Sequence, residues 1–109
     1  MKWIQLQSKE ELEQAIQESK NTPILLFKHS TRCSISSTAL SRLERGWDDS
    51  SKVRPYFLDL ISYREVSAQI EATLGITHQS PQALVVKDGK CIYDASHMSI
   101  RASEILATA

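Results

Sequence analysis

The apolar run Ile24-Leu25-Leu26-Phe27 places the tightest constraint on the fold of this chain. Apolar residues that do not alternate with polar ones are typical of a strand buried on both faces of a sheet. Such a strand needs helices on both sides, and amphipathic helical patterns precede and follow the run. The second helical pattern opens at Cys33, so a thiol stands where a buried strand turns into a helix.

Capping and turn signals divide the rest of the chain. Ser8 with Glu11, and Ser62 with Glu65, match the capping box that begins a helix, and Asp88-Gly89 is a two-residue hairpin signal. The predicted strands are Trp3–Leu6, Ile24–Lys28, Pro55–Leu60, Gln82–Lys87 and Lys90–Ala95. The predicted helices run from Ser8 to about Lys20, from the Cys33 turn to Gly46, from Ser62 to Gly75 and from Ile100 to Thr108.

This order predicts an α/β fold. Strands that alternate with helices form right-handed parallel crossovers, and the final hairpin adds an antiparallel edge. We therefore expect a mixed sheet of four to five strands flanked by helices, formed by residues 1–109 as a single domain. In such sheets chemistry gathers beyond the carboxyl ends of the parallel strands, which is where Cys33 lies.

The composition excludes several classes of function. The chain has 13 Lys plus Arg and 13 Asp plus Glu, and this zero net charge argues against a nucleic-acid-binding surface. No stretch is long and apolar enough for a membrane span, and Met1–Gln5 leads into a polar segment instead of an apolar signal core. We therefore expect a cytoplasmic protein, in a reducing compartment where Cys33 and Cys91 stay reduced.

Cys33 is the candidate nucleophile. A helix N-terminus leaves backbone N–H groups unpaired and favours negative charge, and Arg32 and His29 lie close by in the sequence. Ser36 stands where the second cysteine of a Cys-x-x-Cys pair would be, so its hydroxyl is predicted to donate to the Cys33 thiolate. Since Ser36 cannot resolve a mixed disulfide, an external thiol has to do so. The alternatives are a buried, inert Cys33 and an ordinary polar Ser36.

The histidines and the second cysteine are further candidates for a site. His29, His78 and His97 could join Cys33 in binding a metal, but their spacing matches no zinc pattern, and we expect no metal. Cys91 falls in the second strand of the hairpin, away from the edge of Cys33, which favours a buried structural thiol.

At finer detail, the segment Phe27–Ser36 resembles the monothiol bacilliredoxins, small bacterial proteins with a thioredoxin-like fold. The segments Ser80–Gln82 and Asp94–His97 are also similar to that family. Pro81, before the next-to-last strand, stands in the place of the thioredoxin cis-proline, and Lys87–Lys90 resembles the thioredoxin hairpin. The resemblance extends over essentially the whole chain, and the segment around Cys33 is its most specific part.

The resemblance implies an oxidoreductase that removes bacillithiol from S-thiolated proteins through a Cys33 mixed disulfide. Bacillithiol is then the thiol co-substrate, and its malate carboxylates would suit the cations of Arg32 and Lys28. In this fold the residue before the cis-proline pairs with an extended substrate, which assigns docking to Ser80 and Pro81.

Two rival functions stay open. A monothiol glutaredoxin-like protein would use glutathione or carry an iron–sulfur cluster. Such proteins resemble a Cys-Gly-Phe-Ser signature, whereas Ser34 and Ile35 occupy its two middle positions in this chain. In addition, no Gly-Gly pair follows the last strand. A non-catalytic thioredoxin-fold module would only dock a partner at Ser80-Pro81. A stress-related scaffold is a further interpretation that the residues do not address.

Overall fold

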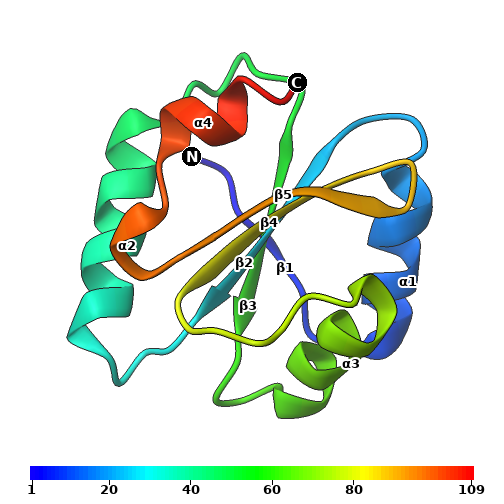
Figure 1. Ribbon diagram of the computed structural model, residues 1–109, viewed down its shortest axis with the longest axis horizontal. Coiled ribbons are helices and arrows are strands. Elements are labelled where there is room, and N and C mark those ends of the chain that lie inside the picture. Colours follow the sequence, from blue (N-terminus) through cyan, green and yellow to red (C-terminus); the bar gives the residue numbers. More distant parts are fainter.

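A five-stranded sheet in the order β1-β3-β2-β4-β5 runs through the molecule, and the computed structural model describes residues 1–109 (Figure 1). Its strands are β1 (Ile4–Gln5), β2 (Ile24–His29), β3 (Arg54–Asp59), β4 (Gln82–Lys87) and β5 (Lys90–Ser96). β1, β3 and β2 are parallel, whereas β4 pairs antiparallel with both β2 and β5. The predicted α/β class, the mixed sheet and its antiparallel edge are confirmed.

Helices cover both faces of the sheet. The helices are α1 (Lys9–Glu18), α2 (Ser34–Gly46), α3 (Arg64–Leu74) and α4 (Ala102–Leu106). Apolar side chains of α1 and α3 pack in one core cluster, and those of α2 and α4 pack in the other, so each pair covers one face (Figure 1). A short 3₁₀ helix, η1 (His97–Ser99), follows β5 and is absent from the sequence prediction.

β2 is the centre of the core, as predicted. All six of its residues are buried, because β3 and β4 flank it and helices cover both of its faces. Ile24 and Leu26 belong to the α1–α3 cluster, whereas Leu25 and Phe27 belong to the α2–α4 cluster. This alternation also sends the last two side chains of β2 to opposite faces.

One of the two predicted capping boxes is wrong. The Ser8 hydroxyl accepts the N–H of Glu11 at 3.1 Å and caps α1. The Ser62 hydroxyl instead donates to the Asp59 carboxylate at 3.0 Å, and α3 begins one residue later, after Tyr63. Asp59 ends β3, and its carboxylate accepts both the N–H and the hydroxyl of Ser62, so the Ser62 side chain is held toward Asp59.

The glycines differ in their roles. Gly75 ends α3 with a φ of 70°, and the Asp88-Gly89 turn has φ values of 53° and 73°, so both predicted turns are confirmed. Gly46, predicted to end the second helix, is the last residue of α2, so that prediction is confirmed. A Cβ at Gly46 would lie 3.0 Å from the Cβ of Ala102, so Gly46 allows α4 to pack closely against α2.

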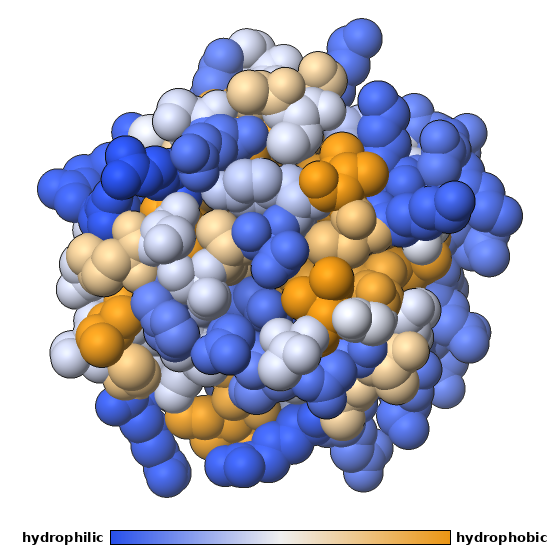
Figure 2. All heavy atoms as spheres, in the orientation of Figure 1, coloured by the Kyte–Doolittle hydropathy of each residue, from blue (hydrophilic) through white to orange (hydrophobic).

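Polar and charged residues cover most of the face in Figure 2, with apolar residues in small groups among them. The large apolar side chains that are most exposed are Ile35, Ile92 and Met98, each about half exposed. None of the helices combines the length and the apolar character that crossing a membrane requires.

Candidate functional site

Cys33 lies at the junction between β2 and α2 and is the N-cap residue of α2. Its backbone is extended, its N–H donates to Ser30 O at 3.2 Å, and its carbonyl accepts the Ser37 N–H at 3.1 Å. The thiol is free and the residue is partly exposed. The sulfur therefore belongs to the residue that directly precedes the first turn of a helix, where unpaired N–H groups and the helix dipole favour negative charge.

The Ser36 hydroxyl does not bond the Cys33 sulfur, contrary to the prediction from helical spacing. Ser36 is fully buried; its Oγ accepts the Ser30 N–H at 3.0 Å and lies 2.8 Å from His29 Nδ1. These two partners lie beneath the turn, where no water competes for the hydroxyl. Ser36 thus ties the Ser30–Cys33 turn to the first turn of α2.

His29 is buried in an aromatic cluster. Its ring centroid lies 5.3 Å from that of Phe57 and 6.0 Å from that of Phe27, and Trp3 stacks on Phe27. Burial lowers the pKa of the His29 imidazole, against the opposing effect of nearby carboxylates. His29 is therefore neutral near pH 7, and it contacts Ser36 instead of being the neighbouring cation that the sequence suggested.

Lys28 leaves β2 on the opposite face and is also buried. Its relative exposure is 0%, and its Nζ lies 3.1 Å from His78 Nδ1. Burial lowers the pKa of Lys28, and Glu71 opposes this effect. The suggestion that Lys28 shares a cationic rim with Arg32 is corrected, since only Arg32 is exposed.

The loop that leads into β4 lies at the same edge of the sheet as Cys33. The register pairs Lys28 with Gln82 and Gln82 with Ser96, so the end of β2, the start of β4 and the end of β5 adjoin. The Ser80–Pro81 peptide bond, directly before Gln82, is cis, and Pro81 O accepts the His97 N–H at 3.0 Å.

Ser80 has one unusual feature. Its hydroxyl oxygen is buried and makes no hydrogen bond. The strand register described above brings the Arg32–Cys33 turn and the Ser80–Pro81 segment to one edge of the sheet.

Cys91 lies at the other end of the sheet. It pairs with Val86, which pairs with Ile24 at the start of β2, whereas Cys33 follows the end of that strand. Six strand residues span roughly 20 Å, well beyond disulfide reach. The Cys91 thiol donates to Tyr93 O at 3.3 Å, and burial raises its pKa.

The three histidines lie at the same end of the fold but apart from one another. His29 faces α2, His78 bonds Lys28 on the face of α3, and exposed His97 follows β5. No three His, Cys, Asp or Glu side chains gather in an arrangement that could hold a metal ion.

Sequence reasoning missed the side-chain partners at this edge. His78 also lies 3.3 Å from the Ser67 hydroxyl, and buried Gln82 donates its Nε2 to Thr77 O at 3.0 Å. A signal was present in the sequence, because Lys28 directly follows a fully apolar strand segment and needs a polar partner there.

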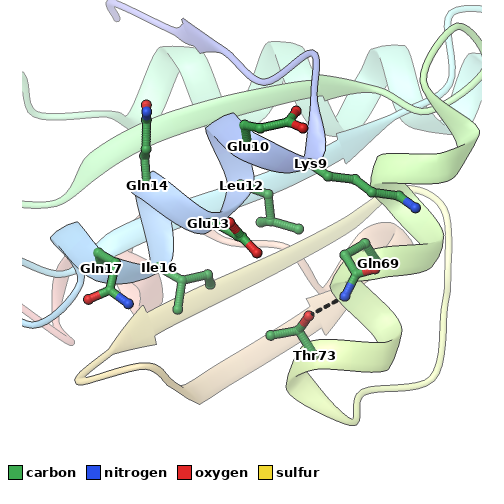
Figure 3. Close-up of a pocket in the computed structure, with 9 residues that line it drawn as sticks. All are labelled: Lys9, Glu10, Leu12, Glu13, Gln14, Ile16, Gln17, Gln69 and Thr73. Atoms are coloured by element: carbon green, nitrogen blue, oxygen red, sulfur yellow. Dashed lines mark hydrogen bonds between the residues drawn. The ribbon is translucent and has the colours of Figure 1, made fainter.

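The hollow shown in Figure 3 lies between α1 and α3 and contains no nucleophile. Seven of its nine lining residues are polar or charged, with Gln69 Nε2 donating to Thr73 Oγ1 at 2.9 Å. Its lining residues are Lys9, Glu10, Leu12, Glu13, Gln14, Ile16, Gln17, Gln69 and Thr73. It has no part in the geometry around Cys33.

Comparison with known proteins agrees with this architecture. A protein described as having a thioredoxin fold is 30% identical, with 96% of this chain and 90% of that one covered and a TM-score of 0.82. Thioredoxin from Fasciola hepatica is 20% identical, with 95% and 93% covered and a TM-score of 0.72. Thioredoxin from Trypanosoma brucei brucei is 12% identical, with 97% and 86% covered and a TM-score of 0.77. The two thioredoxins establish the fold alone.

The family model described as monothiol bacilliredoxin BrxC matches residues 4–105, which is nearly the whole chain. The thioredoxin-like fold inferred from the sequence is therefore confirmed, and the segment around Cys33 falls within the match. The chain belongs to the monothiol bacilliredoxin family.

Proposed function

We propose that this protein removes bacillithiol from S-bacillithiolated proteins by thiol–disulfide exchange at Cys33. The observation that carries the proposal is a free, partly exposed thiol at the N-terminus of α2, with a serine where a resolving cysteine would be. Family membership supports bacillithiol as the small thiol.

The exchange takes place in two steps. The Cys33 thiolate attacks the bacillithiol sulfur of the mixed disulfide, a new S–S bond forms, and the target protein leaves as its thiolate. A second bacillithiol thiolate then attacks the bacillithiol sulfur bound to Cys33. The products are bacillithiol disulfide and the Cys33 thiolate, so the second bacillithiol supplies the electrons that reduce the target.

Ser36 makes the second step depend on an external thiol. Because residue 36 has no sulfur, the adduct on Cys33 cannot collapse to an internal disulfide. Ser36 holds the turn through its hydrogen bonds with Ser30 and His29, so that Cys33 stays at the N-terminus of α2.

Substrate docking is assigned to two groups beside Cys33. The backbone at Ser80 and Pro81 pairs with an extended segment of the target protein, as a strand edge does. The exposed guanidinium of Arg32 adjoins the nucleophile and suits the malate carboxylates of bacillithiol. We place this reaction in the cytoplasm, where reduced thiols are available.

Intact mass after treatment with bacillithiol disulfide tests the proposal. We expect one added bacillithiol, which peptide mapping places on Cys33. The adduct should be lost in Cys33→Ser and kept in Cys91→Ser, the matched control. The absence of an adduct, or an adduct on Cys91, would overturn the proposal.

The choice of small thiol is tested by competition. One model protein is prepared as its bacillithiol and as its glutathione mixed disulfide, and both are offered in the same reaction. We expect faster release of bacillithiol. Equal rates, or faster release of glutathione, would favour the glutaredoxin-like alternative.

A further inference from the structure

A second polar cluster lies behind the loop that ends at Pro81, on the α3 face of β2. Lys28 Nζ contacts His78 Nδ1 at 3.1 Å, and the Ser67 hydroxyl approaches the same nitrogen at 3.3 Å. Lys28 is fully buried and Ser67 is nearly so, whereas the third member of the cluster, His78, is exposed to solvent.

The amine of Lys28 forms no ion pair, although the Glu71 carboxylate is near enough to raise its pKa. The ion pairs of the protein join Met1 to Asp49 and Arg54 to Glu18, and neither involves Lys28. An ammonium only donates, so His78 Nδ1 accepts from it and the ring carries its proton on Nε2. A buried amine with a neutral partner is costly, and an apolar side chain of similar size would be at least as stable. Stability therefore does not account for Lys28.

The partner of this amine sits in the loop that leads to the cis peptide bond. The His78 N–H donates to the Glu71 carboxylate. On either side, Gln82 Nε2 donates to Thr77 O at 3.0 Å, and Gln82 Oε1 accepts the Gln79 N–H at 3.4 Å. Residues 77–79 are thus held from three directions, and Lys28 provides the contact that ties them to β2.

We propose that Lys28 and His78 are positioning residues whose hydrogen bond fixes residues 77–79, and with them the Ser80–Pro81 backbone on which the mixed-disulfide protein docks. This inference rests on the proposed docking at Ser80–Pro81. It assigns a role in substrate affinity to a buried lysine that touches neither Cys33 nor solvent.

The geometry gives β2 a double role. Its last two residues point to opposite faces of the sheet, where His29 meets Ser36 and Lys28 meets His78. The first contact holds the turn of the nucleophile, and the second holds the docking loop. The distance between the attacking sulfur and the docking backbone is thus set by one rigid strand.

Lys28→Met separates this role from a structural one. Methionine keeps most of the length and volume of the side chain and removes the donor. We expect the unfolding midpoint to stay equal or to rise, while KM for a bacillithiolated model protein rises about tenfold, the scale of one hydrogen bond. The rate constant kcat, and the rate of Cys33 alkylation by iodoacetamide, should stay within twofold. Lys87→Met, at an exposed lysine at the far end of β4, is the matched control.

Two variants of His78 complete the test. In His78→Asn the side-chain oxygen can replace Nδ1 as the acceptor, so KM should return toward the wild-type value. His78→Leu should raise KM as Lys28→Met does and also lower stability, because it leaves the buried amine without a partner. The double variant Lys28→Met/His78→Leu should regain stability without regaining affinity.

The outcomes separate this inference from the proposed function. Wild-type protein that forms no Cys33 adduct refutes the function itself. If wild type is active and Lys28→Met leaves KM unchanged, or lowers kcat and alkylation together, the positioning role is wrong and the function stands. Should Lys28→Met fail to fold, the comparison of His78→Leu with His78→Asn decides.

Discussion

The Ser36 hydroxyl oxygen lies 2.8 Å from Nδ1 of His29 and joins the first turn of α2 to the last residue of β2. The same oxygen accepts the Ser30 N–H, so its hydrogen is free to donate to the neutral imidazole. In a Cys-x-x-Cys protein a second sulfur would occupy this place. Here an internal hydrogen-bond hub has replaced it.

Ser36→Ala should lower the free energy of unfolding by about 1–3 kcal/mol, because it leaves a buried N–H and an imidazole without their partner. Urea unfolding measures the loss. Ser37→Ala is the control, since Ser37 is exposed on the next position of the same helix. Equal losses in the two variants would contradict the role of Ser36 as a hub.

Ser36→Cys should change the product of the first exchange step. The new thiolate attacks the Cys33 sulfur of the adduct, releases bacillithiol as its thiolate, and leaves a disulfide between positions 33 and 36. Intact mass should show the adduct in wild type and, in the variant, only the loss of about two hydrogens. Ser37→Cys, which presents an exposed thiol one residue away, should keep the adduct. An internal disulfide between positions 33 and 37 would contradict the assignment of the resolving place to position 36.

Stability should fall with acidification through about pH 6.5. Burial lowers the pKa of both His29 and His78 below their ordinary value of 6.5, so in this range the unfolded chain binds more protons than the folded chain. The free energy of unfolding is therefore fully retained above pH 6.5 and decreases below it. Urea titrations at about pH 7.5 and about pH 5.5 measure the difference. His78→Asn should reduce this difference. An unchanged difference in His78→Asn would contradict the assignment.

Gly46→Ala should destabilise the protein although alanine favours helices. Propensity alone would add at most about 1 kcal/mol of stability at this last residue of α2, but the new Cβ meets the Ala102 Cβ at 3.0 Å, and overpacking of this kind costs about 1–3 kcal/mol. We expect a lower Tm by thermal unfolding and partial recovery when Ala102→Gly is added. A higher Tm in the single variant would show that α4 shifts freely.

Much of the fold was predictable because its determinants are local. The apolar run of β2, the Ser8 cap, the αL glycine at position 75 and the Asp88-Gly89 turn each act within a few residues. Prediction failed where two local signals competed. At Ser62 the hydroxyl donates to the Asp59 carboxylate instead of capping the helix.

The site was predictable only in part. The position of Cys33 at the start of a helix follows from the strand and helix patterns. The partners of Ser36 and Lys28 do not, because each hydrogen bond crosses between elements and depends on their packing. His78 lies fifty residues from Lys28, and no spacing rule connects the two.

The placement of the two cysteines determines what oxidation can produce. Cys33 and Cys91 belong to opposite ends of the sheet, and both are free. Oxidation of the folded chain therefore cannot close a loop within one molecule. Every disulfide of the folded protein instead joins one of its two cysteines to a sulfur of another molecule.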